Sequence, residues 1–237
     1  MNLKVDVHHG DGVEEEFKLS PKVLTYSIHH FAAGFFPNTG NISANNAFSL
    51  NVPLRQNVPD RDWIELNWFG IGHAFKSFQP DIMVIQAGGD SLYNDDHKAL
   101  KVTSDGYLKV INFILKYRKP TLILGGGGYN EPATSKLWTQ ISALCNGKIL
   151  RDDIPSTDPY FLRYGPDFTL NESDDCPPGI PMSTADIETI KNNIKMKTAK
   201  IQDLTSNMPK LSKRPFRKRP FRELENQDDD FDDVRIS

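Results

Sequence analysis

Short runs of apolar residues, each bounded by glycine, proline or polar residues, recur through the first half of the chain. Runs of this length that are rich in β-branched residues are typical of buried strands. They predict strands at residues 23–29, 81–87 and 120–124.

Between and after these runs, apolar residues recur at spacings of three and four, the period of an amphipathic helix. The pattern predicts helices at residues 62–78, 104–116 and 186–204. Ser183 or Thr184 is the expected N-cap of the last helix, because a hydroxyl side chain can accept a hydrogen bond from a free backbone N–H. The alternation of strands and helices predicts an α/β fold built on a parallel sheet.

Three polar, glycine-containing segments lie where strands are expected to end, at residues 6–12, 88–91 and 125–129. In an open parallel sheet, the loops beyond the carboxyl ends of the strands hold the ligand site. We therefore expect these three segments to meet and to form one functional site.

The chain has 237 residues, with 28 Lys and Arg against 31 Asp and Glu, a formal net charge of -3. This balance excludes a globally basic nucleic-acid binder, so no direct nucleic-acid readout is expected. Its two cysteines cannot build a disulfide scaffold or an all-cysteine zinc site. No apolar run approaches the roughly 18 residues of a membrane helix, and the start lacks a signal-peptide pattern. We expect an intracellular protein with no membrane association.

The composition changes near residue 206, and we expect a folded part at residues 1–205 and a disordered tail at residues 206–237. Residues 210–222 hold seven basic and no acidic residues, and residues 223–233 hold seven acidic and no basic residues. The basic part contains a repeated Lys-Arg-Pro-Phe-Arg unit and is a candidate nuclear-import segment. The alternative is a solvated linker neutralised by the acidic block. The import candidates are Lys213, Arg214, Arg217, Lys218, Arg219 and Arg222.

Asp6 and His8 are two residues apart, so an extended backbone directs both side chains to the same face. Asp90 follows two glycines at a predicted strand end and is the natural third ligand. One imidazole and two carboxylates with an open fourth position suit a catalytic zinc, or another borderline divalent ion. Taken singly, His8 fits a structural or surface histidine better than a ligand, and Asp90 fits a turn former better.

The four glycines at 125–128 lack the Lys-Ser/Thr of a phosphate loop, and they predict close approach of the backbone to a ligand. Tyr129 directly after them would act as a hydroxyl donor to a carbonyl oxygen; the alternative is a tyrosine that caps its own loop. Asp11 is expected to orient a neighbouring histidine, or else to form an Asp-Gly turn. Phe35 and Phe36 would wall a narrow tunnel or pack beneath their loop. Ser27 would make a polar contact behind the metal loop.

These motifs, in this order, resemble those of the zinc-dependent class I histone deacetylases, which have the arginase/deacetylase fold. The ureohydrolases of the same fold need a further aspartate where this chain has Leu92, and they fit less well. The resemblance extends from residue 5 to about residue 204. The matching segments are residues 6–17 (DVHHGDGVEEEF), 34–40 (GFFPNTG), 86–92 (QAGGDSL), 121–130 (TLILGGGGYN) and 164–167 (YGPD).

The resemblance implies a three-layer α/β fold with a parallel sheet and a site that hydrolyses N-acetyl-lysine in histone tails or other proteins. It also implies a role in chromatin regulation and transcription repression, a corepressor complex as partner, and a nuclear or, secondly, cytoplasmic location. Carried over by position, it assigns the following roles: zinc ligands Asp6, His8 and Asp90; catalytic residues Tyr129 and Asp11; substrate contacts Phe36, His97 and Gly127; and a potassium site at Ser27 and Ile28.

Several positions depart from the family pattern. The resemblance covers only the second half of the family's catalytic domain, so the sheet is expected to be N-terminally truncated, with an open edge and an uncovered apolar face. The adjacent histidine pair that serves as general base is absent. Lys4 stands where an aspartate is expected, and His97 stands at a usually apolar tunnel position. Asp96 replaces a frequent arginine, so inositol-phosphate-dependent corepressor binding is not expected. The alternative function is a non-catalytic interaction module or pseudoenzyme.

Overall fold

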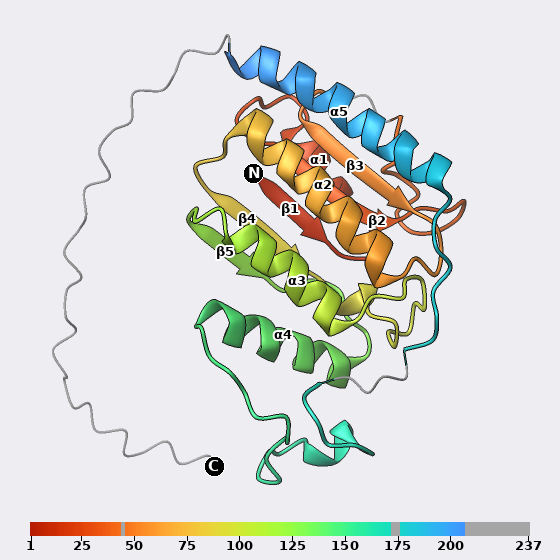
Figure 1. The fold of residues 1–237 in the computed structure, drawn as a ribbon, viewed down its shortest axis with the longest axis vertical. Coiled ribbons are helices and arrows are strands. Elements are labelled where there is room, and N and C mark those ends of the chain that lie inside the picture. The colour runs from red at the N-terminus through yellow and green to blue at the C-terminus, as the bar shows by residue number, and fades with distance from the viewer. Residues whose placement is uncertain (44–45, 172–175, 207–237) are drawn as a thin grey trace, which may run out of the picture. The chain divides into compact units, whose positions relative to one another are not determined.

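The computed structural model describes residues 1–43, 46–171 and 176–206, and these described residues belong to one compact unit (Figure 1). All its strands are parallel and pair in the order β3-β2-β1-β4-β5. The strands are β1 (Asn2–Val5), β2 (Thr25–His30), β3 (Ser49–Leu54), β4 (Met83–Ala87) and β5 (Thr121–Leu124). The α-helices are α1 (Asp11–Phe17), α2 (Asp60–Phe78), α3 (Ser104–Leu115), α4 (Glu131–Cys145) and α5 (Thr184–Ser206). Two short 3-10 helices, η1 (Gly89–Ser91) and η2 (Phe161–Tyr164), complete the set.

The three predicted strands and three predicted helices are confirmed as β2, β4, β5, α2, α3 and α5. Strand β3 was not predicted, because Asn51 and Pro53 interrupt its apolar run. The structure explains both residues. Pro53 is tolerated because β3 is an edge strand. The Asn51 side-chain amide donates a hydrogen bond to Glu14 at 3.0 Å. Helix α4 was also missed, although Asn130 caps it by accepting the Ala133 N–H at 3.1 Å.

The two faces of the sheet pack against different helices. Tyr26 on β2 points to α2, where its hydroxyl donates to Asn67 at 3.3 Å. The neighbouring residue Ser27 points the other way, because side chains alternate along a strand. On that second face lie Ser27 and Asn51, which are register partners, and Glu14 of α1 packs there. Helices therefore flank both faces, as predicted for a three-layer fold.

Strand β5 leaves part of the sheet uncovered. Leu122 and Leu124 lie on its second face and are 53% and 45% exposed. The other edge of β5 has no strand partner among the described residues. The expected open edge and uncovered apolar surface are thus both present.

Helix α5 packs against α2 and β3. Ser183 accepts the Asp186 N–H at 3.1 Å, and its hydroxyl donates to the Asp186 carboxylate at 2.7 Å, which confirms Ser183 as the N-cap. None of the described helices is long and apolar enough to cross a membrane. The predicted disordered tail and import segment lie outside the described residues, apart from Ser206 at the end of α5.

Tyr107 of α3 joins the ends of two strands. Its buried hydroxyl donates to the backbone oxygens of Val5 and Gly88, the latter at 2.5 Å. Both oxygens lie directly before the segments that carry Asp6 and Asp90. Helix α3 therefore fixes the spacing of these two segments through the Tyr107 hydroxyl.

We expect Tyr107→Phe to lower the free energy of unfolding by about 1–3 kcal/mol, because it removes the hydroxyl donor of the buried Gly88 oxygen. The Val5 oxygen keeps the Gly88 N–H as a donor. Urea denaturation followed by circular dichroism measures this change. Tyr160→Phe is the matched control, since Tyr160 is exposed. Equal stability of both variants would show that the Tyr107 hydroxyl does not join the strands.

Candidate metal centre

The three polar segments meet at one edge of the sheet because β1, β4 and β5 are neighbours and run parallel. Asp6 follows β1 directly, Asp90 lies in η1 after β4, and the glycine run follows β5. The expectation that these segments meet is confirmed by their placement.

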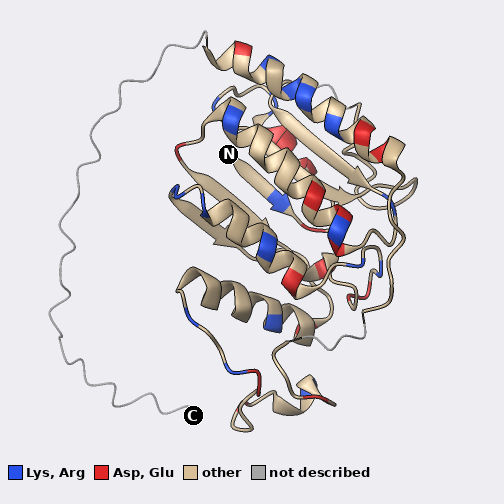
Figure 2. Ribbon diagram, viewed as in Figure 1, with Lys and Arg blue, Asp and Glu red and all other residues tan. Residues whose placement is uncertain are grey.

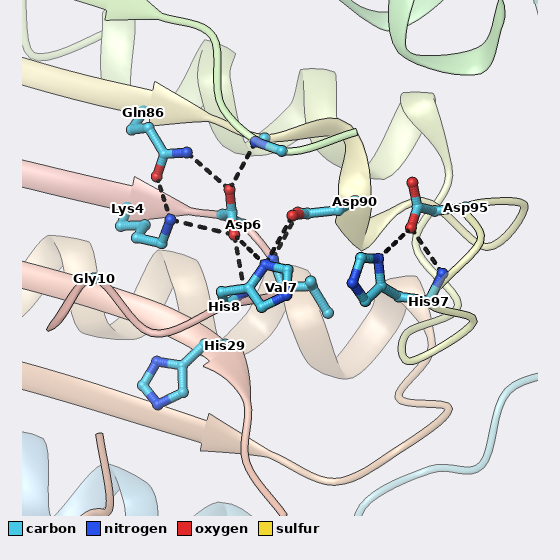
Figure 3. A network of polar contacts seen from close by, with 12 residues as sticks. Lys4, Asp6, Val7, His8, Gly10, His29, Gln86, Asp90, Asp95 and His97 are labelled. Carbon is cyan, nitrogen blue, oxygen red and sulfur yellow. Dashed lines mark hydrogen bonds and ion pairs between the residues drawn. The ribbon is translucent and has the colours of Figure 1, made fainter. Parts of the chain in front are cut away.

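Asp6, His8 and Asp90 form a compact cluster in which one ligand atom from each lies within 4.8 Å of the others (Figure 3). The His8 Nδ1 atom is 3.0 Å from Asp90 Oδ2 and 3.3 Å from Asp6 Oδ1. Both aspartates are almost fully buried, and His8 is partly exposed. The imidazole nitrogen and the two carboxylates therefore converge on one point, and the site is exposed to solvent on the side where His8 lies.

The two carboxylates respond differently to burial. Burial and the charge of Asp6 raise the pKa of Asp90. Burial also disfavours ionisation of Asp6, but hydrogen bonds from His8 and the charge of Lys4 outweigh it and hold the pKa of Asp6 well below its usual range. Hydrogen bonds to Asp6 and Asp90 raise the pKa of His8 to about 9. In the metal-free protein, a proton on His8 thus neutralises part of the negative charge.

Lys4 and Gln86 hold Asp6 in place from neighbouring strands. Lys4 is the one Lys, Arg, Asp or Glu residue in the five described strands, and the strands in Figure 2 are otherwise almost entirely tan. Its Nζ atom lies 3.2 Å from Asp6 Oδ1 and 2.8 Å from Gln86 Oε1. The Gln86 amide donates to Asp6 Oδ2 at 2.7 Å. Gln86 was not predicted as a site residue. Its polar side chain within the otherwise apolar strand β4 could have indicated such a role.

Two glycines, one of the 125–128 run and one after β4, approach the carboxylates closely. A Cβ atom on Gly127 would lie 1.9 Å from Asp90 Oδ2, and one on Gly88 would lie 2.1 Å from Asp6 Oδ2. The Gly127 N–H points to Asp6 Oδ2 at 3.3 Å. No other residue type fits these positions without displacing a carboxylate.

Aromatic rings surround the exposed side of His8. Phe35 stacks on its ring at 5.5 Å between centroids, and Phe36 meets it edge-on at 5.9 Å. Phe36 is 73% exposed, so it borders the cluster without packing beneath its loop. His97 and Tyr129 complete the ring, with centroids 4.8 and 6.5 Å from that of His8. Phe35 and Phe36, the two aromatic residues expected in this loop, both lie against the His8 ring.

Tyr129 is 54% exposed and carries its hydroxyl beside the cluster. Partial burial and the nearby charges of Asp90, Asp6 and Asp95 raise the pKa of Tyr129. Its hydroxyl therefore keeps its proton at neutral pH and is available as a donor. The residue does not act as a cap for its own loop through any contact among the described residues.

Asp11 contacts no histidine among the described residues, so its expected orienting role stays a prediction. Asp11 is exposed, and its carboxylate accepts the Gly12 N–H at 2.8 Å, as in an Asp-Gly turn. Helix α1 begins at Asp11 and turns this side chain outward, whereas Glu14, one turn later, points back to the sheet. Glu14 Oε2 lies 2.9 Å from the His9 Nε2 atom, so Glu14 is the acidic residue of α1 that contacts a histidine.

Ser27 lies behind the metal loop, as predicted. Its hydroxyl oxygen accepts the Gly10 N–H at 3.2 Å and lies 2.9 Å from His29 Nδ1. Burial and the charge of His9 lower the pKa of His29 to about 3, so its ring is neutral and its Nε2–H donates to the Gly40 oxygen at 3.0 Å. Ile28 is buried on β2 beside Val5 of β1.

The donor set fits a divalent ion. One neutral imidazole and two carboxylates are ligands for zinc and for other borderline ions, and they leave a coordination position for water or substrate. Two buried carboxylates at this separation also need positive charge between them, which a divalent ion would supply. The cluster has the chemistry of a catalytic metal site.

Comparison with known proteins finds the sequence model of the histone deacetylase domain matching residues 1–145. The chain is 38% identical to histone deacetylase 8 of Xenopus laevis over 181 residues, which cover 74% of this chain and 55% of that protein. It is 35% identical to histone deacetylase B of Dictyostelium discoideum, covering 71% and 41% of the two chains. It is also 34% identical to histone deacetylase clr6 of Schizosaccharomyces pombe, covering 71% and 42%. The chain thus spans about half the length of the curated relatives it matches.

We expect the affinity of the cluster for Zn²⁺ to rise with pH. The ion needs a neutral His8 ring, and in the metal-free chain this ring keeps its proton up to a pKa of about 9. One proton must therefore leave on binding, and the association constant should rise about tenfold per pH unit below that value. Competition with a chelator of known pH dependence measures it. His73→Gln, a change on α2, should keep the slope, and a pH-independent affinity would contradict the role of His8.

Proposed function

Because the chain belongs to the histone deacetylase family, we propose that it carries the metal-binding part of a lysine deacetylase site, which hydrolyses N-acetyl-lysine in histone tails or other proteins. The observation that supports this most directly is the cluster of Asp6, His8 and Asp90 beside Tyr129. The reaction adds the oxygen of water to the acetyl carbon and breaks the carbon–nitrogen bond. Its products are acetate and the free lysine amine.

We propose zinc as the ion held by Asp6, His8 and Asp90. When bound, it supplies Lewis-acid chemistry to the substrate carbonyl and to water. Gln86, Lys4 and the N–H groups of the loops keep the carboxylates in their positions, so the ligands need little rearrangement. The single-ion assignment agrees with Leu92, which offers no ligand for a second ion.

The other residues of the site act on the substrate directly. The Tyr129 hydroxyl would donate a hydrogen bond to the acetyl oxygen as negative charge develops there. Phe35 and Phe36 would border the apolar methylene chain of the lysine, and the backbone of Gly127 would lie beneath the acetyl group. His97 adds a polar side chain to this border.

The proton acceptor for water is not an adjacent histidine pair of this chain. Its two pairs are otherwise engaged: His8 belongs to the metal cluster, and His9 bonds Glu14. His29 bonds Ser27 and Gly40, and the His30 ring lies 3.1 Å from the Leu54 oxygen. This arrangement keeps the non-catalytic interaction module as the second candidate function.

A potassium ion at Ser27 and Ile28 fits this chain poorly. The Ser27 hydroxyl already bonds Gly10 and His29. Lys4, the register partner of Ser27, brings a positive charge to the adjacent strand. The Lys4 ammonium group would repel a potassium ion there. No step of the proposed reaction therefore uses potassium.

Partners and location follow from the proposed reaction. We propose acetylated histone tails or other acetyl-lysine proteins as substrates, a corepressor complex as partner and the nucleus as the main compartment. We also propose that residues 206–237 form a tail separate from the catalytic part at residues 1–205.

The zinc-loaded chain is expected to bind acetohydroxamate and to release acetate from an acetyl-lysine peptide. Without a positioned base, the rate should be roughly 10²–10⁴-fold below that of a site that has one. Asp90→Asn should lower zinc affinity at least about 100-fold. Asp81→Asn changes an exposed aspartate just before β4 and should have no effect.

The outcomes separate the two candidate functions. Hydroxamate binding without acetate release would identify the interaction module. A wild-type zinc affinity in the Asp90→Asn variant would reject the metal cluster itself.

Deleting residues 213–222 from a fluorescent fusion of the chain is expected to shift it from the nucleus to the cytoplasm, because the deletion removes six basic residues. Replacing residues 213–222 by a neutral linker of equal length removes the same positive charge without shortening the tail, and it should have the same effect. Deleting the acidic residues 223–233 is the control. Unchanged nuclear entry after loss of the basic segment would reject the import role.

A further inference from the structure

Asp95 is a fully buried aspartate that received no role in the proposed function. It follows η1 by four residues, and its side chain points toward His97 (Figure 3). Its Oδ1 atom accepts the His97 backbone N–H at 2.9 Å and lies 3.0 Å from His97 Nδ1. Its Oδ2 atom accepts the backbone N–H groups of Tyr129 and Asn130 at 2.7 and 3.3 Å.

These four contacts connect two loops that come from different strands. The loop after β4 carries Asp90, Asp95 and His97, and the loop after β5 carries Tyr129. Within the described part of the chain, no Lys or Arg forms an ion pair with Asp95. Backbone N–H groups and one imidazole therefore stabilise its charge, which makes the placement of those groups depend on the carboxylate.

In the run before Tyr129, Gly127 is held by Asp6 and by the Gly89 N–H, whereas the first two glycines are open to solvent. Gly125 and Gly126 are exposed, and Gly128 has a φ of 139°, a conformation that favours glycine. A run of four glycines does not fix the direction of the side chain that follows it. The Asp95 carboxylate supplies that constraint at the first residue after the run.

We propose that Asp95 is a positioning residue that holds Tyr129 and His97 beside the metal cluster. This inference rests on the proposed function, because it gives Asp95 its effect through the Tyr129 hydroxyl. The His97 ring lies 4.6 Å from the Tyr129 ring and 4.8 Å from the His8 ring, so one carboxylate sets two of the rings around the ligand position.

The Nδ1–H of His97 donates to Asp95, which leaves Nε2 as the atom that faces away from the carboxylate. In Figure 3 the His97 ring extends from Asp95 toward the cluster of Asp6, His8 and Asp90.

The test replaces Asp95 by asparagine, which keeps the shape but turns one acceptor oxygen into an NH₂ group. In either orientation of the amide, an N–H would face donors of Tyr129 or His97. Asp96→Asn is the matched control, because Asp96 is the adjacent residue and is exposed. Tyr129→Phe, alone and combined with Asp95→Asn, shows whether Asp95 acts through the hydroxyl.

Two quantities are measured on the full zinc-loaded chain: zinc affinity and acetohydroxamate affinity. Asp95→Asn is expected to weaken acetohydroxamate binding about tenfold and to leave zinc affinity within about twofold. In the Tyr129→Phe background the same change should have an effect below about twofold, since the hydroxyl is gone. Equal losses in both backgrounds, or a parallel loss of zinc affinity, would overturn the positioning role.

Amide hydrogen exchange gives a readout that needs neither zinc nor a folded variant. The Tyr129 N–H should be protected in the wild-type chain and in Asp96→Asn, whereas the exposed Gly125 and Gly126 N–H groups should exchange quickly. Rapid exchange of the Tyr129 N–H in the wild-type chain would overturn the inference even if Asp95→Asn does not fold. If the wild-type chain binds no acetohydroxamate, the proposed function fails, and the Tyr129 exchange rate alone decides the role of Asp95.

Discussion

The close approach of two buried carboxylates is the constraint on which this structure depends. Asp6 and Asp90 have ligand oxygens within 4.8 Å of each other, and both are almost completely removed from solvent. Like charges in such a position repel each other strongly unless positive charge or hydrogen-bond donors compensate. In the metal-free chain that compensation comes from the His8 proton, the Lys4 ammonium group and backbone N–H groups.

The architecture around the carboxylates serves to hold them at this distance. Parallel pairing of β4 with β1 brings the two strand ends together, and the Tyr107 hydroxyl bonds the backbone at both ends. Glycines at 88 and 127 remove the side chains that would otherwise occupy the space of the carboxylate oxygens. The Tyr107 contacts of α3 and the missing side chains of the two glycines therefore both help to set the distance between Asp6 and Asp90.

Lys4 distinguishes this site electrostatically. A lysine on a central strand costs desolvation energy, and Asp6 and Gln86 offset it by binding the ammonium group. Its charge lies next to the ligand carboxylate, so it opposes a further cation in the same region. The buried pair of Glu14 and His9 on the second face gives α1 a fixed place against β3 through Asn51. Two polar networks, one at the sheet edge and one behind it, thus fix the loop that carries His8.

The sequence by itself determined the strands β2, β4 and β5, the helices α2, α3 and α5, and the three segments that meet at the site. These follow from local periodicity and from the rule that parallel strands end at one edge. It did not determine β3, whose Asn51 and Pro53 are explained by a partner on α1 and by an edge position. Likewise, Asp11 and Glu14 are both acidic and close in sequence, and only the start of α1 decides which of them faces His9. The contacts of Asp95 and Gln86 join residues from different strands, so they depend on strand order and register, which the tertiary structure alone decided.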